Sequence, residues 1–452
     1  MMLLRGSLAL AVVLCGFAAG CRTVNKGITE AVLERGKSDE WHVHYGNHSH
    51  YTLTNDIFEG MEFEGVADVN GLAVHYPPGL APQAQSIAGV TANLLRRVQQ
   101  RLGITITTGS TLHLLRFDRV PQYFDIELEV EPNEFPLPLF VQAGQESWES
   151  ILMQNPAYPY VFVHELVETS LVSRQAHGRV LPDLAWGPVL LKAHVNNYTR
   201  WFRDGLANYA GYVAYETFAE EIVGSERLRF QETALHTRPF SSLAMLRGKL
   251  FSWPQSSRTR DQRLHYNAAL GLFLLIAEQF GEEAIREINA EIARRQVVDG
   301  RDLREITSQV LGTDVKEFVN RFEFPRTGLH LERVTPARAL NHGLEVREGL
   351  LVEKVEPNSI AAEAGLQDKD IIVTADGAAT VNQLDFELAL LRARTQDALA
   401  LTIQRKDTGT LTLEMPLRAA QSSLAQRPVP GRWHKPLKKG RTEFLSSFPL
   451  FF

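Results

Sequence analysis

Apolar positions along the chain change their spacing twice, and each spacing predicts a different kind of structure. Before Ser147, apolar and polar residues alternate in short runs, which is typical of half-buried strands. One exception has apolar residues three and four positions apart and stops at Gly103, so it predicts an amphipathic helix. The elements predicted here are strands at 41–54, 71–76, 111–117 and 137–142, and a helix at 87–102.

After Ser147 the helical spacing predominates, and from Thr327 to Leu417 short strands with glycine-rich turns return. A strand layer followed by a helix bundle indicates the α+β fold class with segregated parts. We therefore expect one domain at 41–325 and a small β-rich domain at 326–418. The predicted helices of the larger domain lie at 160–173, 199–216, 266–280 and 285–292, and the segment 303–322 completes this mainly helical half.

The first twenty residues have the pattern of an export signal. Arg5 precedes an apolar run from Leu8 to Phe17, and small residues follow directly before Cys21. Such a run is too short for a stable membrane-spanning helix. A cysteine after Ala-Ala-Gly resembles the lipobox of bacterial lipoproteins, which implies cleavage after residue 20 and a lipid on Cys21. The alternative is an ordinary cleaved signal followed by a chance cysteine.

The residues on either side of the two domains suggest where the protein is located. Arg22 follows Cys21, and nothing resembles an inner-membrane retention signal, so we expect an outer-membrane anchor that faces the periplasm. Residues 21–40 are predicted as a polar tether. Residues 419–452 are basic and contain several prolines, which predicts a disordered tail. That tail either contacts anionic lipid or binds through its apolar end to the peptide groove of the C-terminal domain.

Composition excludes several kinds of chemistry. The chain has two cysteines, Cys15 in the leader and Cys21, so the expected mature body has no disulfide, no thiol chemistry and no cysteine-ligated metal. The formal net charge of −6 argues against nucleic acid as a partner. A composition of 44% hydrophobic and 22% charged residues is that of a globular protein.

The strongest chemical signal is the run His164-Glu165-Leu-Val-Glu168 within a predicted helix. Residues four apart share a helix face, so His164 and Glu168 can approach one metal ion. Glu165 beside them is a candidate general base for a metal-bound water.

A second segment, from Trp201 to Tyr209, reads Trp-x-x-Asp-Gly-Leu-Ala-x-Tyr with Asp204 as its acid. The two segments together resemble gluzincin zinc peptidases, in which the third ligand is an acidic residue on a later helix. With the predicted strands and helices, residues 41–323 are similar to peptidase-MA-like domains of the glycyl aminopeptidase branch. The resemblance implies Zn²⁺, or another divalent metal, held by His164, Glu168 and Asp204, with Glu165 activating water.

Two departures from that pattern leave a second interpretation open. Glu168 stands where the family has its second histidine, and Asp204 is one methylene shorter than glutamate. Two anionic ligands make a bound metal a poorer Lewis acid, and an oxygen-rich set suits Mn²⁺ or Fe²⁺ as well as zinc. Arg203, next to Asp204, offers a competing charge. The alternative is a pseudopeptidase in which His164, Glu168 and Asp204 form a polar cluster and no metal is bound.

The C-terminal domain carries a more specific pattern. A strand at 350–355, a Pro-x-Ser turn, Ala364-Gly365-Leu366 and Asp370-Ile-Ile resemble a bacterial PDZ domain. PDZ domains bind extended C-terminal peptides as an added strand. We expect the carboxylate-binding loop and the start of the edge strand at Gly343, Leu344, Glu345 and Val346. A helix at 382–392 is expected to form the second wall.

Two functions follow from this sequence. One is a membrane-anchored lipoprotein that hydrolyses peptides with a metal. The other is an inactive scaffold that captures protein C-termini in its PDZ groove. A PDZ domain that only packs against its neighbour is a third possibility for the C-terminal part.

Overall fold

The computed structural model describes most of the chain between residues 40 and 417, and Cys21 lies outside the described residues. The described ranges are 40–45, 49–54, 64–69, 72–106, 111–117, 124–127, 136–142, 158–172, 179–180, 198–218, 238–253, 262–334, 346 and 348–417. Among these residues, no helix combines the length and the apolar character that crossing a membrane requires.

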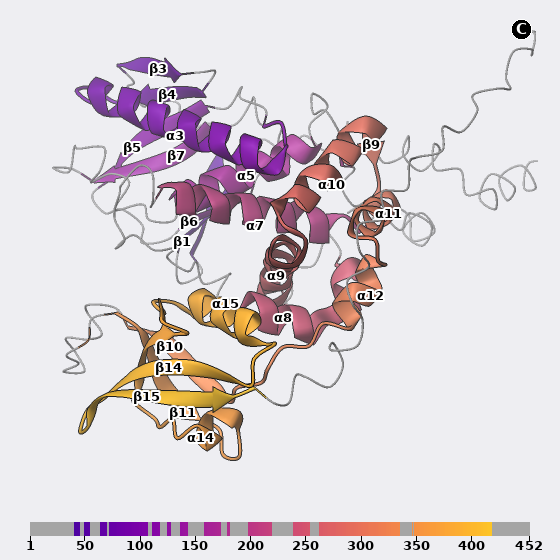
Figure 1. Ribbon diagram of the computed structural model, residues 1–452. Coiled ribbons are helices and arrows are strands. Elements are labelled where there is room, and N and C mark those ends of the chain that lie inside the picture. The colour runs from indigo at the N-terminus through magenta and orange to yellow at the C-terminus, as the bar shows by residue number, and fades with distance from the viewer. Residues whose placement is uncertain are drawn as a thin grey trace, which may run out of the picture.

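Two small sheets and a long helix form the N-terminal layer. One sheet has the order β3-β4-β5-β7, in which β4, β5 and β7 are parallel and β3 is antiparallel. Helix α3 lies along this sheet (Figure 1) and buries an apolar stripe that includes Ile87, Leu94 and Val98. It ends at Gly103, whose φ of 63° is left-handed, as the sequence predicts. The bounds are β3 (Gly65–Val69), β4 (Leu72–Tyr76), α3 (Ala81–Leu102), β5 (Thr111–Phe117) and β7 (Pro136–Gln142).

The second sheet has the order β2-β1-β6. The segment 41–54, predicted as one strand, is an antiparallel pair in which Glu40 lies opposite Thr54. A single run of alternating residues therefore covers both halves of a hairpin. The bounds are β1 (Glu40–Tyr45), β2 (Ser49–Thr54) and β6 (Phe124–Glu127).

A bundle of helices, called here the helical region, follows the sheets. Helix α7 packs between α5 and α9, and α9 packs in turn against α8 and α10. The segment 303–322 forms two helices, because Gly312 has a left-handed φ of 66° and ends the first. The elements are α5 (Tyr158–Val172), β8 (Arg179–Val180), α7 (Arg200–Thr217), α8 (Pro239–Leu246), the 3-10 helix η4 (Arg247–Ser252), α9 (Gln262–Phe280), α10 (Glu282–Arg295), β9 (Val297–Val298), α11 (Gly300–Leu311) and α12 (Val315–Asn320).

The C-terminal domain is a twisted antiparallel sheet with two helices. Its strand order is β10-β11-β12-β14-β15, with the short β13 paired to β12, so β10 is an edge strand. Helix α15 begins with a capping box between Asn382 and Asp385. The elements are β10 (Leu329–Arg333), β11 (Leu350–Val355), α14 (Ile360–Glu363), β12 (Ile371–Ala375), β13 (Ala378–Ala379), α15 (Gln383–Ala393), β14 (Ala398–Arg405) and β15 (Gly409–Pro416).

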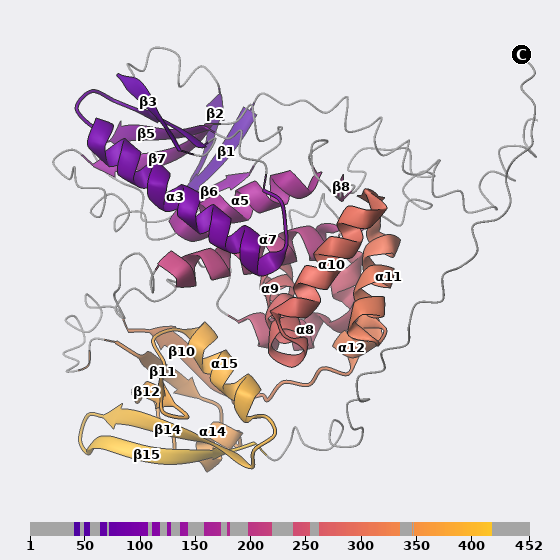
Figure 2. The same cartoon turned by 45° about the horizontal axis from the view of Figure 1, so that its top comes forward.

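Helix α15 belongs to two hydrophobic cores at once. It lies between the C-terminal sheet and α8 (Figures 1 and 2). One face adds Leu384, Leu388 and Leu391 to the core of the helical region. The other face adds Phe386 and Leu390, with two alanines, to the core of the C-terminal domain. The two domains therefore share a helix as well as an interface.

Polar contacts across the interface involve the same helix. The Glu387 carboxylate accepts hydrogen bonds from the Phe240 amide at 2.7 Å, from the Ser241 amide at 3.3 Å and from the Ser241 hydroxyl. It thus caps the N-terminus of α8, whose own N-cap residue, Arg238, makes no side-chain cap. Burial raises the pKa of Glu387, and the bonds from Ser241 and Phe240 and the charge of Arg238 offset part of that rise. Farther along α15, Arg392 pairs with Glu278 of α9 at 2.6 Å.

Glycine at position 271 permits the close packing of α9 on α8, and its replacement tests this contact. A Cβ there would lie 2.3 Å from the Pro239 carbonyl oxygen, a backbone atom that cannot rotate away. We expect Gly271→Ala to lower the free energy of unfolding by about 1–3 kcal/mol, measured by urea denaturation.

Gly89→Ala is the matched control, because a Cβ at this exposed position of α3 meets nothing within 4 Å. It should raise the free energy of unfolding by roughly 0.4–1 kcal/mol. Equal effects of the two substitutions would contradict the packing described here.

Candidate functional site

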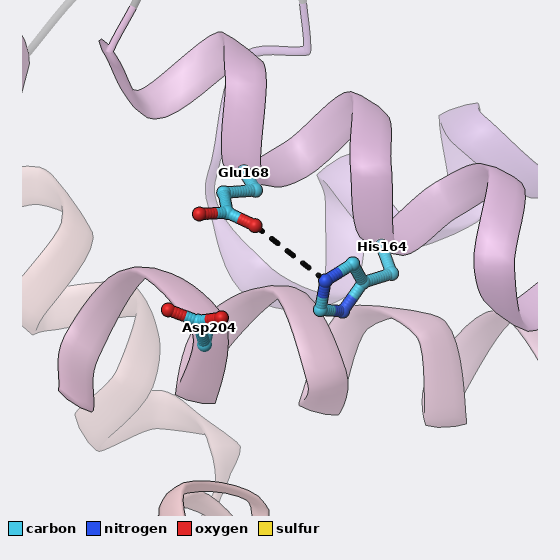
Figure 3. Close-up of side chains that lie close together, drawn as sticks. All are labelled: His164, Glu168 and Asp204. Carbon is cyan, nitrogen blue, oxygen red and sulfur yellow. Dashed lines mark ion pairs between the residues drawn. The ribbon is translucent and has the colours of Figure 1, made fainter. Parts of the chain in front are cut away.

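Helices α5 and α7 bring the predicted metal-binding residues together. His164 and Glu168 lie one turn apart on α5, and Asp204 lies on α7, so that the three side chains point toward one another (Figure 3). One possible ligand atom from each residue lies within 4.8 Å of the other two. The His164 Nε2–Glu168 Oε2 distance is 3.6 Å. The structure thus juxtaposes all three residues, whereas the side chain of Glu165 lies outside the part of the chain that it describes.

Two glycines of α7 set how closely its neighbours approach. A Cβ at Gly205 would lie 2.7 Å from the Phe273 ring of α9, and one at Gly211 would lie 2.8 Å from the Tyr160 carbonyl oxygen of α5. The Tyr160 hydroxyl also donates to Asn208 Oδ1 at 2.6 Å. These contacts fix Asp204 opposite α5 and explain why glycine follows the acid in the sequence pattern.

Each carboxylate of the cluster already has an arginine from α7. Arg203 Nη1 lies 3.2 Å from Glu168 Oε1, and Arg200 Nε lies 3.3 Å from Asp204 Oδ2. The arginine side chains are 4% and 9% exposed, so both positive charges are buried with the carboxylates. The two positive charges of the guanidinium groups and the two negative charges of the carboxylates sum to zero, so the cluster needs no further cation for charge balance.

Arg200 has further contacts that hold it in place. Its guanidinium carbon lies 4.4 Å from the centre of the Trp253 ring, a cation–π distance. Its Nη2 donates to the Tyr266 hydroxyl at 2.6 Å. Burial alone would lower the pKa of Arg200, but the nearby Tyr266, Asp204 and Glu168 outweigh it and raise that pKa.

The two carboxylates respond differently to this environment. Burial acts to raise the pKa of Glu168, but the interactions with His164 and Arg203 outweigh it, so the pKa falls below its usual range and Glu168 stays ionised. Burial and the nearby Glu168 charge raise the pKa of Asp204, and the two arginines offset this only in part. Asp204 Oδ1 is also buried and makes no hydrogen bond within the described structure.

A second candidate site lies between β10 and α15 and is called here the groove. It is a cavity of about 850 Å³. Its apolar lining comes mainly from β10, α15 and the segment before β10, with single residues from α14 and from the end of β15, and includes Phe324, Leu329, Leu331, Ile360, Phe386, Leu390 and Leu417. The turn before β10 contains Gly328, with a left-handed φ of 72°. An unpaired strand edge beside an apolar helix face is the geometry that accepts an added peptide strand.

The predicted peptide-binding residues fall largely outside the part of the chain that the structure describes. Gly343, Leu344 and Glu345 lie outside the described residues, and Val346 packs against Val334 and Ile371 in a small separate cluster. The strand facing α15 is β10, which begins directly after Gly328. Strand β10 is positioned by its antiparallel pairing with β11. The predicted second wall at 382–392 corresponds to α15.

Sequence reasoning also missed functional neighbours. Arg200 could have been found, because it lies four residues before Asp204 on the same helix. The groove lining from α8 has no such local signal, because it comes from residues far away in the sequence.

Comparisons with known proteins support the C-terminal assignment. The PDZ domain family matches residues 325–417. No curated protein matches the chain. Residues 325–417 are therefore a PDZ domain.

Three solved structures are similar to parts of the chain. The HtrA3 PDZ domain bound to a phage-derived ligand shares 30% identity over 20% of this chain and 83% of that one, with a TM-score of 0.18. The HtrA-type protease AlgW with a decapeptide shares 19% identity over 26% of this chain and 34% of that one, with a TM-score of 0.20. An aminopeptidase N family protein from Idiomarina loihiensis shares 13% identity over 83% of this chain and 73% of that one, with a TM-score of 0.34.

Removing Arg203 tests the charge balance of the cluster. Arg203→Ala leaves Glu168 ionised and poorly compensated, so the free energy of unfolding should fall by about 3 kcal/mol in denaturant titrations. Adding Glu168→Gln should recover most of that loss, because the uncompensated charge is then gone.

The control is Arg294→Ala, which removes an arginine 70% exposed and paired with Glu291 on α10. It should change the free energy of unfolding by less than about 1 kcal/mol. A double variant as unstable as Arg203→Ala would mean that Arg203 stabilises through packing rather than charge.

Proposed function

We propose that this chain is a peptide-capturing protein whose PDZ groove binds extended C-terminal segments, while residues 41–325 form an inactive peptidase-like domain. We also propose that the leader before Cys21 is cleaved and that a lipid on Cys21 anchors the protein in the outer membrane, facing the periplasm. The inactivity of the peptidase-like domain is inferred from one observation, the pairing of Glu168 with Arg203 and of Asp204 with Arg200.

A zinc-peptidase centre fits these residues poorly. A divalent ion would bind carboxylates that the two arginines already contact through one oxygen each, and it would add two positive charges to a buried cluster that is already neutral. Glu168 also takes the position of an imidazole ligand. We infer that this arginine-paired cluster replaces a metal, and that the helical region is kept for its shape.

The PDZ domain supplies the binding activity in this proposal. Its edge strand β10 and the apolar side of α15 offer main-chain hydrogen bonds and a pocket for an apolar side chain. Arg326 lies in the turn before β10, where a terminal carboxylate would be received. These features favour protein C-termini with an apolar last residue as ligands.

A metal-dependent peptide hydrolase is the second candidate function, and one observation favours it. Asp204 Oδ1 is buried without a hydrogen bond, and ligand atoms of His164, Glu168 and Asp204 lie within 4.8 Å of one another. In this candidate the three residues would hold the ion, and Glu165 would act as general base.

Elemental analysis separates the two candidates. We expect the purified protein, after incubation with zinc or manganese and gel filtration, to retain far less than one metal per chain. Glu168→Ala should give the same value. One metal per chain in the wild type, lost in Glu168→Ala, would favour the hydrolase instead.

The engineered pair Glu168→His/Arg203→Ala serves as the positive control, because it restores the second imidazole and removes the competing charge. It should gain zinc if the fold places the ligands correctly.

Peptide binding is tested with ligands selected from a random library displayed with free C-termini. The wild-type protein should select sequences that end in an apolar residue. The selected peptide should lose about tenfold or more in affinity when its terminal carboxylate is amidated, measured by fluorescence anisotropy, because charge-assisted hydrogen bonds are lost.

Equal affinity for the acid and the amide would show that the groove does not read a C-terminus. Because the modification is in the peptide, the protein fold is the same in both measurements.

A further inference from the structure

The groove of the PDZ domain has a wall from the other domain. Helix α8, its N-cap residue and the first residue of η4 contribute to the lining. The side chains they contribute are Arg238, Ser241, Ala244, Met245 and Arg247. A peptide in the groove would therefore contact both domains.

A hydrogen-bonded chain crosses the groove at one point. Arg238 Nε donates to Gln383 Oε1 at 3.0 Å, and Gln383 Nε2 donates to the Leu331 carbonyl of β10. Among the described strands β10 pairs with β11 alone, and the Leu331 carbonyl, which Gln383 of α15 reaches, lies on the other edge of β10. Gln383 thus occupies an acceptor that an added peptide strand would use.

We propose that Arg238 of the helical region is a specificity-determining residue of the PDZ groove. A bound peptide replaces Gln383 at the Leu331 carbonyl, and Arg238, released from Gln383, pairs with an acidic side chain upstream of the peptide C-terminus. This inference rests on the proposed peptide-capturing function and adds the class of ligand: an apolar C-terminal residue preceded by acidic residues.

Charge in the groove favours such a ligand. Three arginines line it, at positions 238, 247 and 326, together with three glutamates. Two of those glutamates have partners, since Glu387 caps α8 and Glu356 lies 3.2 Å from His330. The Arg238 side chain is exposed and contacts the neutral amide of Gln383, so it can exchange that partner for a carboxylate.

The position of Arg238 is fixed by the same contacts that join the domains. Its backbone amide donates to Asn267 Oδ1 at 2.7 Å, and the next turn of α8 is capped by Glu387 of α15. The backbone of Arg238 is therefore held beside the groove, and only its side chain needs to rotate to reach a bound peptide.

The experiment uses two peptides of equal length with the same selected C-terminal residue, one with glutamates upstream and the other with glutamines. The wild-type chain should bind the acidic peptide about two- to fivefold more tightly, and the ratio should fall as salt is raised. Arg238→Glu should reverse the preference. Arg294→Glu, on α10 and outside the groove lining, should leave the ratio unchanged.

Gln383→Ala tests the exchange at Leu331 separately. It removes the side chain that competes for the edge carbonyl, so both peptides should bind more tightly by a similar factor. Circular dichroism confirms folding of each variant.

Two failures are distinguishable. If neither peptide binds the wild type, the proposed function falls, and this inference falls with it. If both peptides bind but Arg238→Glu leaves their affinity ratio unchanged, the groove captures peptides without Arg238, and only this inference is overturned.

Discussion

The burial of α15 on both of its faces is the constraint on which the arrangement of this protein depends. Leu384, Leu388 and Leu391 recur at helical spacing and face the helical region, while Phe386 and Leu390 face the C-terminal sheet. Burying each leucine contributes roughly 2 kcal/mol. Separating the domains would expose all three leucines and leave the α8 N-terminus uncapped. The helix that forms one wall of the PDZ groove is thus fixed from behind.

The cluster on α5 and α7 shows how an arrangement suited to a metal can be satisfied by other means. In a buried site, charges must be compensated by neighbours of opposite sign. Here Arg200 and Arg203 supply that compensation from the same helix as Asp204. Arg200 is additionally held by Trp253 and Tyr266, which makes its displacement by a cation costly. The three side chains lie close together, and the carboxylate charges are already compensated.

Local patterns in the sequence predicted most elements but few of the long-range choices. The helix ending at Gly103 and the spacing of His164 and Glu168 depend on neighbours within one or two turns, and the structure contains both. The boundary at Gly312, which ends α11, was not predicted from the apolar spacing of this segment. Local sequence did not identify β10 as the strand that faces α15, because that position depends on long-range pairing with β11.

A chain of close contacts links the arginine-paired cluster to the groove, and in the proposed function it gives the helical region a role that needs no catalysis. Asp204 precedes Gly205, where α7 meets the Phe273 ring of α9. Two residues earlier on α9, Gly271 meets the Pro239 carbonyl of α8. Arg238, the N-cap residue of α8, lines the groove, and Glu387 of the PDZ domain caps this helix. Such contacts hold one wall of a binding site in place. Loss of peptidase chemistry would therefore leave a reason to keep the α7–α9–α8 packing intact.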